Sequence, residues 1–181
     1  IDITDDVFAK LLDIIKPGIK ENDVAAQITY WHKMLGADKD SFDPIVASGW
    51  RGALPHGMAS DKIIEKGEMV TLDFGCVYDG FCSDMTRTIS VGEPSAEMKK
   101  IYGIVKVAQQ SALDAAKSGM TTKQLDSVAR DYIYAEGFEG KFGHGLGHGL
   151  GIEVHEMPSL SQRMDMALPV NSVVTVEPGI Y

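Results

Sequence analysis

Residues 142–156 read Phe142-Gly-His144-Gly-Leu-Gly-His148-Gly-Leu-Gly-Ile-Glu-Val-His155-Glu156, and they hold three of the five histidines of the chain. Glycine occupies every second position from 143 to 151, and glycine lets the backbone approach another strand or a ligand closely. Histidine is the commonest metal ligand. The stretch alone fits either a glycine loop with surface histidines or a metal site, and carboxylates elsewhere in the chain favour the metal site.

The composition is that of an ordinary globular domain with 181 residues, 44% of them hydrophobic. The net charge, 17 − 26 = −9, argues against a nucleic-acid partner. No apolar run approaches the roughly 18 residues of a membrane span, so no membrane partner is expected. The only cysteines are Cys76 and Cys82, which fits a reducing compartment and predicts a cytoplasmic protein.

Hydrophobic spacing predicts helices that alternate with groups of strands. Helices are expected over four stretches, the last three with a capping residue before them: 4–15, 23–35 (Asn22), 96–117 (Ser95) and 123–136 (Thr122). Extended segments are expected over 43–55, 69–78, 81–91 and 172–177. Helices combined with antiparallel strands predict an α+β fold.

An internal repeat relates the two halves of the chain. A shift of 101 residues places Leu12, Asp13, Lys16 and Gly18 on Leu113, Asp114, Lys117 and Gly119. Both copies have a helix, a break at Lys-x-Gly, a second helix and then a loop that carries histidine. Because the order of elements also matches, we interpret the chain as two related halves around a shared site.

The dipeptide Asp79-Gly80 predicts a tight hairpin turn. With this turn, Val77 pairs with Cys82 and Asp73 pairs with Thr86. Side chains alternate along a strand, so Asp73 and Asp84 share one face and lie about 7–8 Å apart as diagonal neighbours. The same register puts the two cysteines on opposite faces, so no disulfide is expected between them.

Two carboxylates on one buried face repel each other unless a cation lies between them. Gly75, opposite Asp84, leaves room for such a cation. The alternative is that Leu72 and Phe74 mark the buried face, so that the aspartates face solvent. Two aspartates, one imidazole and Glu177 suit Mn, Co, Fe or Zn, and bridging carboxylates favour a site with two metal ions.

These residues stand in motifs that resemble the pita-bread metallopeptidases, specifically the Xaa-Pro aminopeptidase and Xaa-Pro dipeptidase (prolidase) group. The motifs are Leu72-Asp73-Phe74-Gly75, Ser83-Asp84-Met85-Thr86-Arg87-Thr88, His144-Gly-Leu-Gly-His148-Gly with Val154-His155-Glu156, and Val176-Glu177-Pro178-Gly179. The resemblance covers nearly the whole chain. It implies two pseudo-symmetric halves of helices packed on an antiparallel sheet, which agrees with the repeat.

The resemblance also implies a ligand set for two divalent metal ions, expected to be Mn or Co, with Zn and Fe as alternatives. Asp73 should chelate one ion, and Asp84 should bridge both. His148 should bind the other ion. Glu177 should be a ligand and should also move a proton from the attacking water to the leaving amine.

The remaining histidines take substrate roles in the resemblance. His56, in Pro55-His56-Gly57, should lie near the substrate proline and the leaving group. His155 should steady the scissile carbonyl or the tetrahedral intermediate. His144 either lines the proline pocket or supports another site residue, and Glu156 is either such a support or a direct participant.

The family pattern has one more ligand, a bridging glutamate in a Gly-x-Arg-x-Glu segment that would follow Tyr181. We therefore expect residues 1–181 to be a catalytic domain truncated at the C-terminus, and at the N-terminus as well. The chain as given is then expected to lack a complete metal site and to have little activity of its own. The resemblance leaves open whether the parent protein is a homodimer.

The expected reaction is metal-dependent hydrolysis of the bond between an N-terminal residue and proline, in dipeptides or longer peptides, by a hydroxide that bridges the metal ions. The alternatives are a methionine aminopeptidase-like enzyme, a creatinase-like hydrolase and a non-catalytic pita-bread binding module. The wording of the Ser83–Thr88 and His144–Gly149 motifs favours the Xaa-Pro group. Retention of all four ligands in this chain argues against a binding module.

Overall fold

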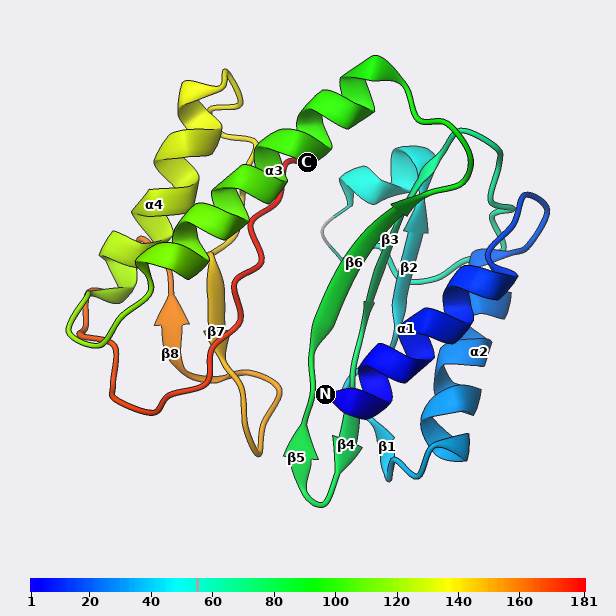
Figure 1. Cartoon of the computed structure of the whole chain (residues 1–181), viewed down its shortest axis with the longest axis horizontal. Coiled ribbons are helices and arrows are strands. Elements are labelled where there is room, and N and C mark those ends of the chain that lie inside the picture. The colour runs from blue at the N-terminus through cyan, green and yellow to red at the C-terminus, as the bar shows by residue number, and fades with distance from the viewer. Residues whose placement is uncertain (55) are drawn as a thin grey trace. The chain divides into compact units, whose positions relative to one another are not determined.

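Two helices cover one face of an antiparallel sheet in the first of two units, residues 1–95 and 96–181 (Figure 1). The structure is a computed structural model and describes residues 1–54 and 56–181. Pro55, in the predicted Pro55-His56-Gly57 motif, lies outside the described residues. The first unit contains α1 (Asp2–Ile14), α2 (Glu21–Met34), β1 (Lys39–Asp40), β2 (Ile45–Ser48), the 3-10 helix η1 (Gly49–Ala53), β3 (Met69–Phe74), β4 (Cys76–Tyr78), β5 (Phe81–Cys82) and β6 (Met85–Ser90).

The predicted hairpin and its register are confirmed. Asp79 and Gly80 both have positive φ angles, 51° and 80°, as a two-residue turn of this kind requires. Val77 pairs with Cys82 and Asp73 pairs with Thr86. The register is the same on both sides of Gly75, so β3–β4 and β5–β6 form one long hairpin, and both cysteines are free thiols.

The two faces of this sheet have opposite characters. Val70, Leu72 and Phe74 are fully buried in the core of the unit, where they meet residues of α1 and α2 such as Leu11. Asp73 alternates with them and is half-buried on the other face. The alternative in which Leu72 and Phe74 mark the core side is thus confirmed, and the aspartate face is the one that the helices leave uncovered.

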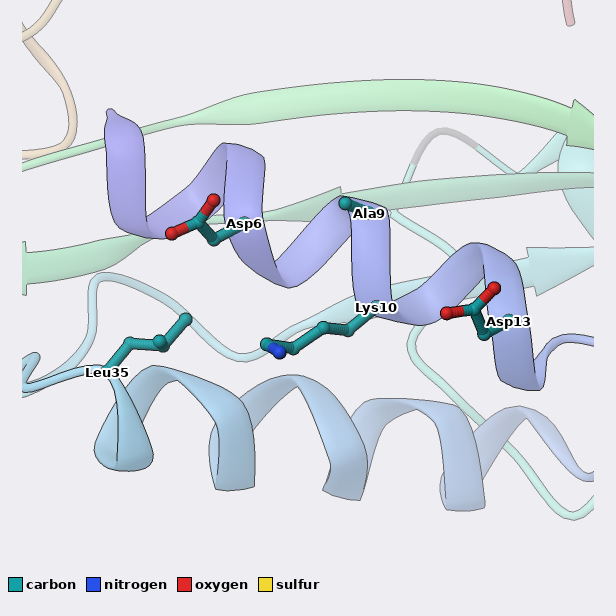
Figure 2. Close-up of a pocket in the computed structure, with 5 residues that line it drawn as sticks. All are labelled: Asp6, Ala9, Lys10, Asp13 and Leu35. Carbon is teal, nitrogen blue, oxygen red and sulfur yellow. The ribbon is translucent and has the colours of Figure 1, made fainter.

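A pocket on the helix side of this unit lies between α1 and α2 (Figure 2). Asp6, Ala9, Lys10, Asp13 and Leu35 line it. The Lys10 ammonium lies 4.8 Å from the centre of the Trp31 ring. Because the pocket is on the helix side, the sheet separates it from the face that carries Asp73.

The second unit repeats the plan with α3 (Ala96–Ala115) and α4 (Thr122–Ala135) packed against each other and β7 (Gly147–Gly149) paired with β8 (Glu156–Leu160). Its core consists of small and aliphatic residues of both helices, such as Ala108 and Leu125, together with Phe142, Leu146 and Leu160. Residues 172–177 run alongside β7 as an extended segment (Figure 1), as predicted, although only Val174 forms a ladder bridge, to Gly149.

The internal repeat extends to individual backbone hydrogen bonds. In each unit the start of the second helix is held by a distant segment, through Glu21 N to Lys62 O and Ile64 N to Ile19 O in the first and Thr122 N to Met166 O and Leu168 N to Met120 O in the second. The helix residues differ by 101 positions and their partners by 104. The pseudo-symmetry is therefore a property of the packing as well as of the sequence, with three extra residues in the second copy.

Two predicted helix caps are wrong. The distant segments accept hydrogen bonds from the first backbone N–H groups of α2 and α4, and this changes which residue caps each helix. Helix α2 begins at Glu21, and Asn22 N donates to Ser60 O instead of Asn22 serving as the cap. Helix α4 is capped by Thr121, which forms a reciprocal capping box with Gln124. Thr122 is fully buried, and its hydroxyl donates to Met164 O at 2.7 Å.

Candidate metal centre

The contact between His148 and Glu177 is the central feature of the site in the second unit. His148 belongs to β7, and Thr175 N in the neighbouring segment donates to His148 O at 2.8 Å. Glu177 lies two residues beyond Thr175, so its side chain emerges on the same face, diagonal to His148. The resulting distance from His148 Nε2 to Glu177 Oε1 is 3.1 Å.

Two glycines allow β7 to lie this close to the chains on both sides. A Cβ atom at Gly147 would overlap the Thr175 carbonyl oxygen, and one at Gly149 would overlap the Met157 carbonyl oxygen. Gly147 and Gly149 therefore serve close packing of β7 between two neighbours, so this part of the 142–156 stretch is not a free loop.

Hydrogen bonds orient the His148 ring for binding through Nε2. Its Nδ1 lies 3.0 Å from Gly149 O, and because a carbonyl can only accept, Nδ1 carries the proton. A histidine that ligates a metal through one nitrogen commonly donates the other N–H to a carbonyl in this way. The His155 ring is tilted against the His148 ring with centres 4.2 Å apart, so a second imidazole lies beside the first.

Thr175 links the two members of the pair. Its hydroxyl accepts from His148 N at 3.0 Å and donates to Glu177 Oε1 at 2.7 Å. Burial on its own raises the pKa of Glu177, but hydrogen bonds from His148 and Thr175 and the electrostatic interaction with both imidazoles nearby outweigh it, so the pKa lies below its ordinary value. Glu177 is thus an anion at neutral pH, as a metal ligand must be.

In the first unit, Asp73 and Asp84 come from the uncovered face of the hairpin, as predicted. Both are half-buried. Asp73 is held in the central strand between Ile45 of β2 and Thr86 of β6. A Cβ atom at Gly75 would overlap the Ser83 carbonyl oxygen, so the opposing backbone takes up the space beside this glycine, and the prediction that Gly75 leaves room for a cation is wrong.

The other predicted site residues lie at different places in the two units. His56 is exposed, two residues before Met58, which bridges to Ile45 next to Asp73. His155 is exposed just before β8, and Glu156 is exposed as the first residue of β8, where its Oε2 accepts from Glu153 N at 3.2 Å. This bond holds the segment before β8, and whether Glu156 supports another site residue or takes part directly stays a prediction.

His144 is half-buried and has a partner on each ring nitrogen. Nδ1 lies 2.7 Å from Gly145 O, and Nε2 lies 3.0 Å from the Tyr181 hydroxyl. The Phe142 ring meets the His144 ring edge-on with centres 5.0 Å apart. Tyr181 was not predicted to be part of the site.

Thr175 was missed although the sequence contains a signal for it. A shift of 104 residues places Val70-Thr71-Leu72-Asp73-Phe74-Gly75 on Val174-Thr175-Val176-Glu177-Pro178-Gly179. Asp73 and Glu177 are then equivalent residues of the repeat, and so are the threonines that precede them. The shift of 101 residues used for the helices does not reveal this match.

Comparison with known proteins places the whole chain, residues 1–181, in metallopeptidase family M24. It is 54% identical over 179 residues to the uncharacterized peptidase YqhT of Bacillus subtilis, covering 99% of this chain and 51% of that protein. It is 49% identical over 180 residues to the Xaa-Pro dipeptidase of Pyrococcus horikoshii, again covering 99% of this chain and 51% of that protein.

The solved structures agree. An X-Pro aminopeptidase from Thermotoga maritima matches with a TM-score of 0.98 and 50% identity, covering 100% of this chain and 51% of that one. The prolidase from Pyrococcus furiosus matches with a TM-score of 0.97 and 49% identity, covering 99% of this chain and 53% of that one. The fold is therefore the pita-bread fold of this family, as the motifs predicted.

The chain spans about half the length of the relatives it matches. The M24 family is one of metallopeptidases, which implies that a divalent metal ion takes part. Among the described residues, no helix is both long and apolar enough to cross a membrane.

Proposed function

We propose that the whole protein hydrolyses the Xaa-Pro bond at the N-terminus of peptides or in dipeptides, at a site with two divalent ions, Mn or Co. Asp73 and Asp84 of the first unit and His148 and Glu177 of the second are the proposed ligands from this chain. The observation that carries the proposal is the His148–Glu177 pair, in which an anionic carboxylate oxygen lies 3.1 Å from the imidazole Nε2 and the other ring nitrogen faces a carbonyl. The Xaa-Pro specificity is inferred from the relatives that bear that name.

The donor set fits such ions. Carboxylate oxygens combined with one imidazole suit Mn, Co, Fe and Zn. When bound, the ions supply Lewis acidity and a water that loses its proton near neutral pH, with a pKa of about 7.

The chain's own residues supply the proton transfers and the positioning. Glu177 accepts a proton as water is activated and delivers it to the leaving amine. The proline nitrogen carries no hydrogen in the substrate, so the leaving group needs this proton. His155, beside His148, stabilises negative charge on the carbonyl oxygen by donating a hydrogen bond. His56 and His144 contact the substrate on the proline side.

The test separates binding of metal from chemistry. His148→Ala should lower the metal content of the purified protein, because a ligand is lost. His155→Ala should lower kcat and leave metal content nearly unchanged. Metal analysis that shows depletion in His155→Ala with retention in His148→Ala would reverse the two assignments.

Substrate choice is tested with Gly-Pro and a longer peptide that begins Gly-Pro, each assayed with Mn, Co and Zn in turn. Gly-Leu and a peptide that begins Met-Ala are the controls. Cleavage of the Met-Ala peptide alone would identify a methionine aminopeptidase-like enzyme. Bound metal without cleavage of any peptide would identify a binding module.

The cytoplasmic location and the homodimer remain predictions.

A further inference from the structure

A buried ion pair on α4 holds the backbone that carries His144. Asp126 is fully buried, and the Arg130 side chain is 12% exposed. Arg130 Nε donates to Asp126 Oδ2 at 2.6 Å and Nη2 donates to Asp126 Oδ1 at 2.9 Å, which is the two-pronged geometry of strong arginine–carboxylate pairs. The residues are one helical turn apart, so α4 itself fixes the pair.

Further hydrogen bonds of this pair go to alternate residues of the glycine-rich stretch. Arg130 Nη1 donates to Phe142 O and Nη2 donates to His144 O, both at 2.6 Å. Leu146 N donates to Asp126 Oδ1 at 3.2 Å. The guanidinium also lies 4.2 Å from the centre of the Phe142 ring, whose edge contact with His144 places the imidazole.

The bond to Leu146 N has a consequence for His144 through a single peptide group. Leu146 N–H and Gly145 C=O belong to the same planar trans peptide, so they point in opposite directions. When Asp126 draws the N–H toward α4, the carbonyl is directed away from it, toward His144 Nδ1 at 2.7 Å. A carbonyl only accepts, so Nδ1 is protonated and Nε2 accepts from the Tyr181 hydroxyl.

We propose that Asp126 and Arg130 are positioning residues that fix the orientation and the Nδ1–H tautomer of His144 through the 142–146 backbone. The pair lies within α4 and acts on His144 through that backbone and through the Phe142 ring that packs between them. The catalytic consequence of this inference rests on the proposed peptidase function, whereas the tautomer itself does not.

The test is the imidazole ¹H–¹⁵N spectrum of the protein, recorded with and without Zn²⁺, which is diamagnetic. In the parent protein His144 should show the Nδ1–H tautomer. Asp126→Asn nearly preserves the shape of the side chain but turns an amide donor toward either Arg130 or Leu146 N. The Gly145–Leu146 peptide group is then no longer held, and the Nε2–H tautomer of His144 should appear. In the peptidase assay, kcat/KM should fall about 10-fold or more, as for loss of other partners that orient site histidines.

Gln162→Ala is the matched control. It removes the bonds that Gln162 Nε2 donates to Asp126 Oδ2 and Ser127 Oγ, each 2.9 Å long, and it leaves the bonds of the pair to Phe142, His144 and Leu146 in place. The control should leave the tautomer and kcat/KM unchanged. If Asp126→Asn does not fold, Arg130→Lys is measured instead. Lysine keeps the positive charge but lacks the two-pronged geometry of the guanidinium, and it should shift the His144 tautomer in the same direction.

An unchanged His144 tautomer in a folded Asp126→Asn or Arg130→Lys protein would overturn the proposal, and so would an equal change in Gln162→Ala. The spectrum needs no turnover. Absence of Xaa-Pro cleavage by the parent protein would therefore refute the proposed function and leave this inference to be decided by the tautomer.

Discussion

Replacement of Thr175 by valine isolates the hydroxyl that joins His148 to Glu177. Valine keeps the shape and removes a 2.7 Å donor to the Glu177 carboxylate and a 3.0 Å acceptor for His148 N. A hydrogen bond to a charged group contributes about 1.5–3 kcal/mol and a neutral one about 0.5–1.5 kcal/mol. Because the Glu177 side chain is 31% exposed, water offsets part of both, and we expect a loss of about 2 kcal/mol in the free energy of unfolding.

The sign of the pH dependence follows from the lowered pKa of Glu177. A carboxyl group whose pKa is lower in the folded state stabilises fully above its unfolded pKa and loses that contribution as the pH falls through the folded value. Thr175→Val raises the folded pKa toward 4.5, its ordinary value. The stability difference between parent and variant should therefore be largest at neutral pH and shrink in acid.

The measurement is urea unfolding of metal-free protein in the presence of a chelator, because bound metal would add its own stabilisation. The Glu177 pKa is read in parallel from its side-chain carbonyl ¹³C shift. Thr88→Val is the control, since the Thr88 hydroxyl hydrogen-bonds a neutral hydroxyl, that of Thr71 at 3.4 Å, and not a carboxylate. A loss below about 0.5 kcal/mol at neutral pH, within the usual range for a surface change, or a loss equal at acid and neutral pH, would refute the linking role.

Two further predictions concern stability. Thr121→Ala should cost about 1 kcal/mol, because it removes the capping box of α4, whereas Asn22→Ala should stay within about 0.5 kcal/mol; thermal or urea unfolding that ranks them the other way would contradict the cap assignment. Asp40→Asn should lower stability by about 1.5–3 kcal/mol at neutral pH, because Asp40 accepts from fully buried His32 at 2.6 Å and from Thr29 at 2.5 Å. Burial raises the Asp40 pKa, but these hydrogen bonds outweigh burial and lower the pKa below 3.8. The loss of stability in Asp40→Asn should therefore fade in acid. A loss that persists in acid would show that it does not come from the Asp40 charge.

The hairpin could be predicted because its determinants are local. Asp79-Gly80 fixes the turn, and the period of two then fixes which residues share a face with Asp73. What local pattern left open was which face the helices cover, since both faces carry apolar residues. The packing of Leu72 and Phe74 against α1 and α2 decided it.

The caps and the supports of the site could not be predicted in the same way, because their partners are distant in the chain. The start of α2 is held by residues near Lys62, and that of α4 by residues near Met166, more than 40 positions away. Arg130 reads as an ordinary polar helix residue in the sequence, and only the fold brings it to the Phe142 carbonyl. Side-chain chemistry at the site was visible in motifs, whereas the bonds that orient those side chains were not.

The repeat relates the proposed ligands of the two units to one another. Ala47 pairs with Thr71 in the first unit, and the shifts of 101 and 104 residues carry this pair onto His148 and Thr175, which are joined in the same way. The carboxylate two residues after the threonine occurs in both copies, as Asp73 and Glu177. The imidazole replaces a small buried alanine, 1% exposed, in the second copy only. A duplicated strand pair thus accounts for one carboxylate in each unit, and divergence at a single equivalent position accounts for the nitrogen ligand of the proposed centre.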